Sequence, residues 1–159
     1  EMRTTVKRNT IQQTQTQMTI QQHIKSIAQQ MGIAYIYHNW TSVNQIADNT
    51  PLPVMVNVLP VSGSFSVGYN LTETTNCLIA FLDKTDYDFD AEENDQVVEQ
   101  MKTLAKDFLL RLNKVEGIEN LSLADVSYEV VYDKLDVNLT GIILDLRLSE
   151  SEGTCPNQY

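Results

Sequence analysis

Acidic side chains form the densest group of potential ligands in this sequence. Seven carboxylates fall within thirteen residues, at Asp83, Asp86, Asp88, Asp90, Glu92, Glu93 and Asp95. The aspartates at 86, 88 and 90 match the first, third and fifth positions of a calcium-binding EF-hand loop. The match ends there, because Ala91 stands where glycine makes the sharp turn and Val97 stands where a bidentate glutamate closes the shell. We therefore expect a solvated loop whose acids favour the start of the next helix, with weak cation binding at most.

The histidines and cysteines do not form a catalytic or metal-binding pattern. His23 and His38 lie on separate elements, and Cys77 and Cys155 have neither a metal-ligand spacing nor the pattern of a disulfide framework. The sequence also lacks a glycine-rich phosphate loop and a nucleophile elbow. We therefore expect no enzymatic activity, no bound metal and no cofactor.

Two helices that would position these groups are predicted from hydrophobic periodicity. Residues 18–31 place apolar side chains at three- and four-residue steps and are followed by Gly32, which is typical of a helix end. Residues 91–114 carry a longer apolar stripe. Asp90 as the N-cap and Glu93 three positions later predict a capping box at the start of this second helix.

The rest of the chain is dominated by strand patterns. We expect strands over residues 33–40, 54–59, 64–70, 75–82, 125–133 and 139–149. Pro60 and Gly63 mark a turn between the second and third strands, residues 41–52 read as a short turn or loop, and residues 134–138 close a hairpin. The order predicts an α+β fold in which two α-helices pack on one face of a mainly antiparallel β-sheet.

Composition and charge divide the chain into three parts. Residues 18–149 form one predicted domain, between a Gln- and Thr-rich N-terminal arm (1–17), expected to be flexible, and a C-terminal tail (150–159). Residues 2–47 carry four basic residues and no acid, whereas residues 48–159 carry twenty acids and seven bases. With Glu1 the net charge is −10, and an acidic body disfavours binding in a nucleic-acid groove. No apolar run approaches the ~20 residues needed to cross a bilayer, and no export signal is visible, so we expect neither membrane insertion nor export.

The order of the predicted elements resembles a known family. The strand patterns at 53–59, 64–70 and 77–82 lead into the long helix and then into the hairpin at 128–133 and 139–148. Over about residues 18–149 this arrangement is similar to the tail-terminator and head-tail joining proteins of tailed bacteriophages, which are small α+β subunits that form rings at the neck. The resemblance is in the order of elements, without signature residues.

The resemblance implies a structural virion protein that is not an enzyme. Its partners would be further copies of itself, in a hexameric or dodecameric ring, and neighbouring connector or tail proteins. DNA would pass through the ring as non-specific cargo, no membrane would be involved, and assembly would take place in the host cytoplasm. A sheet with exposed edges and a long hairpin suits such a ring, because each subunit must present two complementary surfaces.

Two groups of charged residues are candidates for roles in such a ring. Acids that could line the channel and repel passing DNA are Asp83, Asp86, Asp88, Asp90, Asp133, Asp136 and Asp145. The basic residues of the arm, Arg3, Lys7 and Arg8, are expected to contact an acidic neighbouring subunit or partner protein. A tether that contacts nothing is the alternative for the arm.

Three other functions remain open at this point. A small calcium- or ligand-binding module could use the acidic loop at 83–95. An enzyme would need a cluster of titratable groups in a cleft, and the sequence nominates none. An adhesion or pilus-type subunit would share the strand content but would normally carry an export signal.

Overall fold

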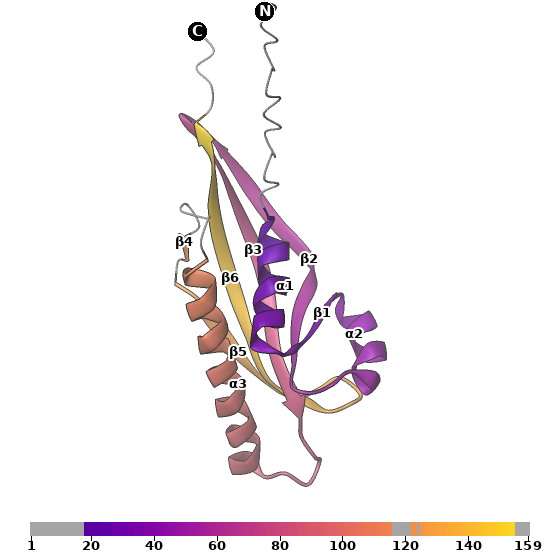
Figure 1. Cartoon of the computed structure of the whole chain (residues 1–159). Coiled ribbons are helices and arrows are strands. Elements are labelled where there is room, and N and C mark those ends of the chain that lie inside the picture. The colour runs from indigo at the N-terminus through magenta and orange to yellow at the C-terminus, as the bar shows by residue number, and fades with distance from the viewer. Residues whose placement is uncertain (1–17, 116–121, 124, 155–159) are drawn as a thin grey trace, which may run out of the picture.

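The computed structural model of the protein describes residues 18–115, 122–123 and 125–154 (Figure 1). Residues 122, 123 and 151–154 are described by their backbone alone. The elements are α1 (Ile20–Met31), β1 (Ala34–His38), α2 (Trp40–Ile46), the 3₁₀-helix η1 (Ala47–Asn49), β2 (Val54–Val67), β3 (Asn70–Lys84), α3 (Ala91–Asn113), β4 (Ser122–Leu123), β5 (Ser127–Lys134) and β6 (Leu139–Thr154). The predicted arm (1–17) lies outside the described residues. Strand β6 extends five residues into the segment that the sequence suggested as a C-terminal tail.

The strands form one sheet in the order β1-β2-β3-β6-β4, and β5 also pairs with β6. Only β1 and β2 run parallel, and every other described pair is antiparallel. Strand β6 pairs with β3 along one side. On its other side it pairs with β5 near its start and with β4 further along. The α+β class and the mainly antiparallel sheet are thus confirmed.

Helices cover both faces of the sheet, although unequally. Because side chains alternate along a strand, Met55 and Phe81 face α1 and α3 and join the larger apolar core. Val56 and Ala80 point the other way and join a smaller core that includes Val43 of α2. The prediction of two helices on one face is confirmed, and the structure adds α2 over the opposite face.

Helix α2 shows that the prediction of a loop over residues 41–52 was wrong. Asn39 caps this helix, since its side-chain oxygen accepts a hydrogen bond from the Ser42 backbone N–H at 2.9 Å. The helix has seven residues, and of these Val43 alone is fully buried. Two turns with one core residue give too short a periodic signal to identify a helix from sequence.

The two longer helices lie within two residues of their predicted ranges at each end. Thr19 and Gln22 form a capping box at the start of α1, and Gly32 ends it in the left-handed conformation with φ of 67°. Asp90 and Glu93 form the predicted capping box of α3, with both hydrogen bonds at 2.9 Å.

Strand β2 is longer than predicted, and the expected turn at Pro60 and Gly63 was wrong. Residues 54–67 form one strand, with a register shift between Val58 and Ser62, and the chain turns only at residues 68–69. A bulge of this kind accommodates proline, which cannot donate a ladder hydrogen bond. The β5–β6 hairpin, in contrast, is confirmed, with its turn at residues 135–138.

Candidate assembly surfaces

The sheet extends well past the helices that cover its other end (Figure 1). We call this part the β-extension and define it as residues 61–67 of β2, the turn at 68–69, residues 70–76 of β3 and residues 147–154 of β6. Pairing of β1 with β2 ends at Val58, so that within the described residues no strand pairs with the outer edge of β2 in the β-extension. Residues 54–58 of β2 are all buried and residues 62–67 are all exposed. One strand therefore runs from the core into solvent.

Three large apolar side chains are exposed toward the tip of the β-extension. Phe65 is 68% exposed, Val67 78% and Tyr69 91%. Phe65 and Val67 lie on the same face as α1, because they pair with Glu73 and Leu71 on the face that continues toward Thr75 and Cys77. Exposed apolar groups gathered at one tip of a domain favour contact with another molecule.

The opposite face of the β-extension is rich in hydroxyl groups and also carries the basic residue Arg147, which pairs with Asn76. Its hydroxyl side chains come from Ser62, Ser64, Ser66, Thr72, Thr74 and Ser149. The hydroxyls of Thr74 and Ser149 are 3.3 Å apart, and Asn76 Nδ2 donates to Ser62 Oγ at 3.4 Å. The β-extension is thus two-sided, with apolar and acidic groups on one face and hydroxyls together with Arg147 on the other.

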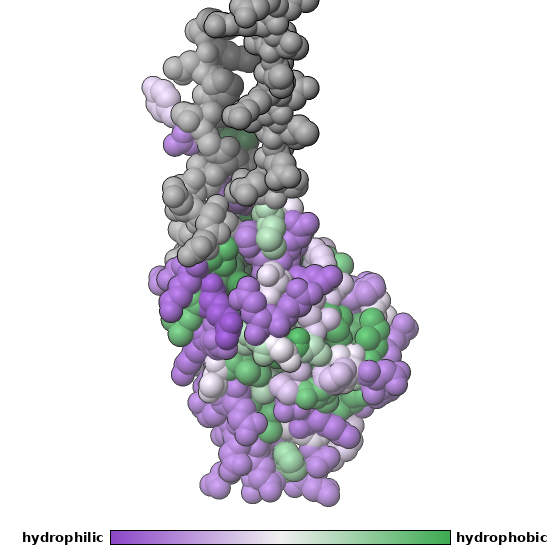
Figure 2. All heavy atoms as spheres, in the orientation of Figure 1, coloured by the Kyte–Doolittle hydropathy of each residue, from purple (hydrophilic) through white to green (hydrophobic). Residues whose placement is uncertain are grey.

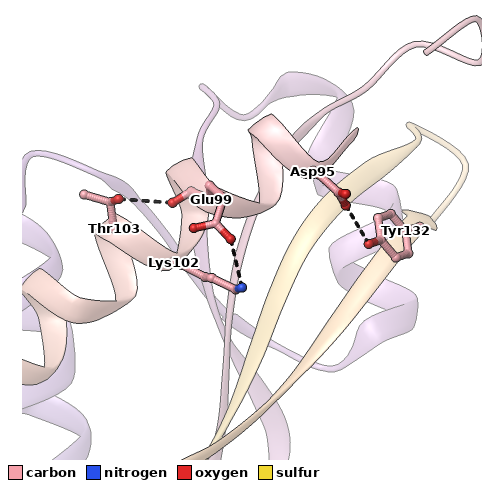
Figure 3. Close-up of polar contacts among 5 residues, drawn as sticks. All are labelled: Asp95, Glu99, Lys102, Thr103 and Tyr132. Atoms are coloured by element: carbon pink, nitrogen blue, oxygen red, sulfur yellow. Dashed lines mark hydrogen bonds and ion pairs between the residues drawn. The ribbon is translucent and has the colours of Figure 1, made fainter. Parts of the chain in front are cut away.

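Strand β5, at one side of the sheet, is held in place by α3 (Figure 3). The Tyr132 hydroxyl donates to Asp95 Oδ1 at 3.0 Å, and this hydrogen bond raises the pKa of Tyr132. Lys102 lies 5.3 Å from the centre of the Tyr128 ring and forms an ion pair with Glu99 at 2.9 Å. These contacts connect α3 to β5. The helix therefore holds this strand in position at the side of the sheet.

The structure gathers six of the seven candidate channel acids at one end of the molecule. These are Asp83 at the end of β3, Asp86 and Asp88 in the following loop, Asp90 at the start of α3, and Asp133 and Asp136 at the β5–β6 turn. Figure 2 shows that hydrophilic side chains predominate at this end. Asp145 is separate, since it lies six residues from Leu139 along β6, a distance of about 20 Å. The seven acids therefore do not form one surface.

Three of these acids also have contacts that maintain the fold. Asp90 caps α3, and Asp133 accepts a hydrogen bond from Thr85 Oγ1 at 3.4 Å. Asp136 accepts from Asn44 Nδ2 at 2.8 Å, and its backbone N–H donates to Asn44 Oδ1 at 2.9 Å, which connects the β5–β6 turn to α2. All three are exposed, as are Asp86, Asp88 and Asp145. Because the contacts of Asp90, Asp133 and Asp136 also maintain the fold, the other three are the better candidates for a purely electrostatic role.

A groove of about 440 Å³ lies at this acidic end. It is lined in part by Asp48, Asp86, Asp136 and Lys84. In the described part of the chain no three His, Cys, Asp or Glu side chains converge in a way that could hold a metal ion. The calcium-binding alternative therefore gains no ligand set from the described residues.

A buried polar cluster beneath α1 was not predicted from the sequence. Asn57 is 0% exposed, and its Nδ2 donates to Gln21 Oε1 and to the Tyr35 hydroxyl. Gln21 Nε2 in turn donates to Cys77 Sγ at 3.5 Å. Burial raises the pKa values of Tyr35 and of Cys77, so that both remain protonated at neutral pH. The cluster fixes α1 on the sheet, and the signal in the sequence was an asparagine inside the apolar run of residues 54–59.

The two histidines, the other residues considered for catalysis or metal binding, lie on separate elements. His23 lies on α1, where partial burial lowers its pKa, and His38 ends β1. Arg3, Lys7, Arg8 and Cys155 lie outside the described residues. Among the described helices none combines the length and the apolar character required to cross a membrane.

No family model matches the chain, and no curated protein matches its sequence.

Proposed function

We propose that this protein is a structural subunit of a closed ring, of the kind formed by tail-terminator and head-tail joining proteins at the neck of tailed bacteriophages. The observation that carries the proposal is the β-extension, which projects past the helices and exposes Phe65, Val67 and Tyr69 to solvent. Exposed apolar groups on a supported sheet favour protein–protein contact over small-molecule chemistry.

The sheet supports a head-to-tail contact between identical subunits. Its two sides are different, with the parallel strand β1 on one side and β4 and β5 on the other. Different surfaces on opposite sides of one subunit favour a heterologous contact, which closes into a ring when the rotation between neighbours divides a full turn. In this ring the tip of the β-extension packs on the next copy.

Acids facing the channel of such a ring would prevent passing DNA from adhering. Asp86, Asp88 and Asp145 fit this role, because they are exposed. Replacing these three with asparagine should leave the particle mass unchanged and slow the release of DNA from assembled particles. Unchanged release would exclude these residues from a role in the channel.

The proposal is tested by the particle mass across a concentration series, measured by light scattering after size exclusion, with negative-stain images of any large species. We expect a closed oligomer with a central hole. The Phe65→Ser/Val67→Ser variant should lose this oligomer, whereas Tyr87→Ser, which alters an exposed aromatic residue in the β3–α3 loop, should retain it. A strict monomer at the highest soluble concentration would contradict self-assembly.

Calorimetric titration with Ca²⁺ separates the ring from the alternative ligand-binding module. The ring predicts no tight site at residues 83–95. A saturable heat that disappears in an Asp86→Asn/Asp88→Asn variant would favour the module instead.

A further inference from the structure

The outer edge of β2 is open along the β-extension. Residues 62–67 are all exposed, and within the described residues they pair only with β3. In an antiparallel pair, alternate residues of a strand direct their N–H and C=O groups to opposite sides, so half of these backbone groups point away from β3. A row of such groups is a template for a further strand.

This edge lacks the residues that commonly protect an open strand. Charged side chains and proline are the usual protection. Pro60 and the register shift lie just before the edge, whereas residues 61–69 contain neither a charged residue nor proline. Phe65 and Val67 are largely exposed on the same stretch. The edge is therefore suited to pairing with another strand.

The chain that precedes α1 joins the domain where this edge begins, on the side of the tip. Met18 lines a pocket of about 520 Å³ together with Val61 of β2. Helix α1 then runs away from the tip, because its end at Met31 leads into β1, whose Ala34 pairs with Val54 at the start of β2 (Figure 1). The residues before Met18 therefore approach the domain along the β-extension.

The seventeen residues of the N-terminal arm have the length and composition of an added strand. Fully extended, they span up to about 56–61 Å, whereas residues 61–67 of β2 span about 23 Å. Residues 9–15 contain no charged residue, glycine or proline. Thr10, Ile11 and Thr14 in this stretch are β-branched, which favours a strand.

We propose that residues 9–15 of the N-terminal arm add to the open edge of β2 in the same chain as an antiparallel strand. The direction follows because β2 runs toward the tip, whereas the arm approaches α1 from the tip. Backbone hydrogen bonds then satisfy the outward groups of β2 and close the edge. This added strand does not depend on the proposed ring, and it differs from the sequence-based expectation that the arm contacts an acidic neighbour.

One register suits both faces of the added strand. Ile11 opposite Phe65 gives an aliphatic–aromatic pair on the α1 face. The same register sets Thr14 opposite Ser62 on the hydroxyl-rich face. Cross-strand pairs of both kinds stabilise antiparallel strands. Residues 16 and 17 then connect the strand to the start of α1.

Hydrogen–deuterium exchange of the full chain, read by mass spectrometry, tests the added strand. The outward amides within residues 62–67 should exchange about tenfold more slowly in the wild type than in Ile11→Pro/Gln12→Pro, since two adjacent prolines remove ladder donors from the arm. The matched control Ile11→Val/Gln12→Thr keeps both backbone N–H groups and the strand preference, so it should retain the wild-type rates. Amides of residues 78–82, in the covered half, should exchange equally in all three proteins.

Two results would overturn the proposal. Equal exchange of residues 62–67 in the wild type and the proline variant would exclude the added strand, including the case in which a neighbouring subunit covers the edge. A difference between these proteins that increases over a hundredfold range of protein concentration would exclude pairing within one chain, because the arm would then pair with another copy. Failure of the ring would be recognised separately, as a monomeric particle mass with the edge still protected.

Discussion

The helix-covered half of the sheet and the β-extension are built from the same strands and have opposite environments. In the covered half, β2 and β3 carry mainly apolar side chains on both faces, and Phe81 packs against Phe108 of α3 with ring centroids 5.7 Å apart. In the β-extension the same strands alternate serine or threonine with larger side chains, and Phe65 is exposed. A strand pattern therefore specifies which side chains share a face, whereas the elements packed on that face determine whether they stabilise the fold or remain available for binding.

The sharpest contrast between the two regions should come from phenylalanine. Phe81→Ala removes a fully buried ring and should reduce the free energy of unfolding by about 3–5 kcal/mol. Phe65→Ala, in the β-extension, should change it by no more than about 0.5 kcal/mol. Urea denaturation of both variants measures the difference. Equal losses would mean that Phe65 is buried in solution and that the contrast is wrong.

Glycine provides the second comparison. A Cβ at Gly141 of β6 would lie 1.9 Å from the Phe81 carbonyl oxygen, so Gly141→Ala forces β3 and β6 apart and should cost about 1–3 kcal/mol or more. A Cβ at Gly68, in the turn of the β-extension, meets no atom within 4 Å, and Gly68→Ala should be close to neutral. Thermal unfolding distinguishes the two variants. A stable Gly141→Ala protein would show that the two strands are packed less closely.

The start of α3 tests whether the acidic end belongs to the stable region. Asp90→Ala removes an N-cap and should reduce the free energy of unfolding by about 1 kcal/mol, whereas Asp90→Asn retains the capping oxygen and should be nearly neutral. Asp88→Ala, two residues earlier in the exposed loop, is the matched control and should be neutral. The measurement is chemical denaturation, and a loss in Asp88→Ala as large as that in Asp90→Ala would contradict the assignment of the cap.

The smallest effect concerns pH and His23 on α1. Burial lowers the pKa of His23 in the folded protein below its ordinary value of 6.5, so the unfolded chain binds more protons in the window below that value. Stability should therefore decrease as the pH falls through 6.5 toward the folded-state pKa. His23→Gln removes this contribution, so between pH 7.5 and 5.5 the wild type should lose slightly more stability than the variant. A wild type that gained stability relative to His23→Gln on acidification would reverse the sign.

Local signals predicted most of the elements, and long-range contacts account for what they missed. The capping box of α3 and the glycine stop of α1 depend on residues within one turn, so they could be predicted. Helix α2 depends on burial of Val43 and on the Asn44–Asp136 hydrogen bonds, whose partners are 92 positions apart. The acidic loop was evident from composition. The separation of Asp145 from the other candidate acids, in contrast, depends on the register of β6, which places Asp145 about 20 Å along the strand from Leu139.

By itself, the sequence determined where the two longer helices lie, which strands alternate, and how basic and acidic residues divide between the arm and the body. These properties depend on near neighbours and on composition, which are written directly in the chain. The tertiary structure decided that β2 passes through the bulge at Pro60 as one strand, that Phe81 is buried while Phe65 is exposed, and that Glu73 faces Glu150. These properties depend on register and on which element covers which face, and both arise from packing between residues that are far apart in the sequence.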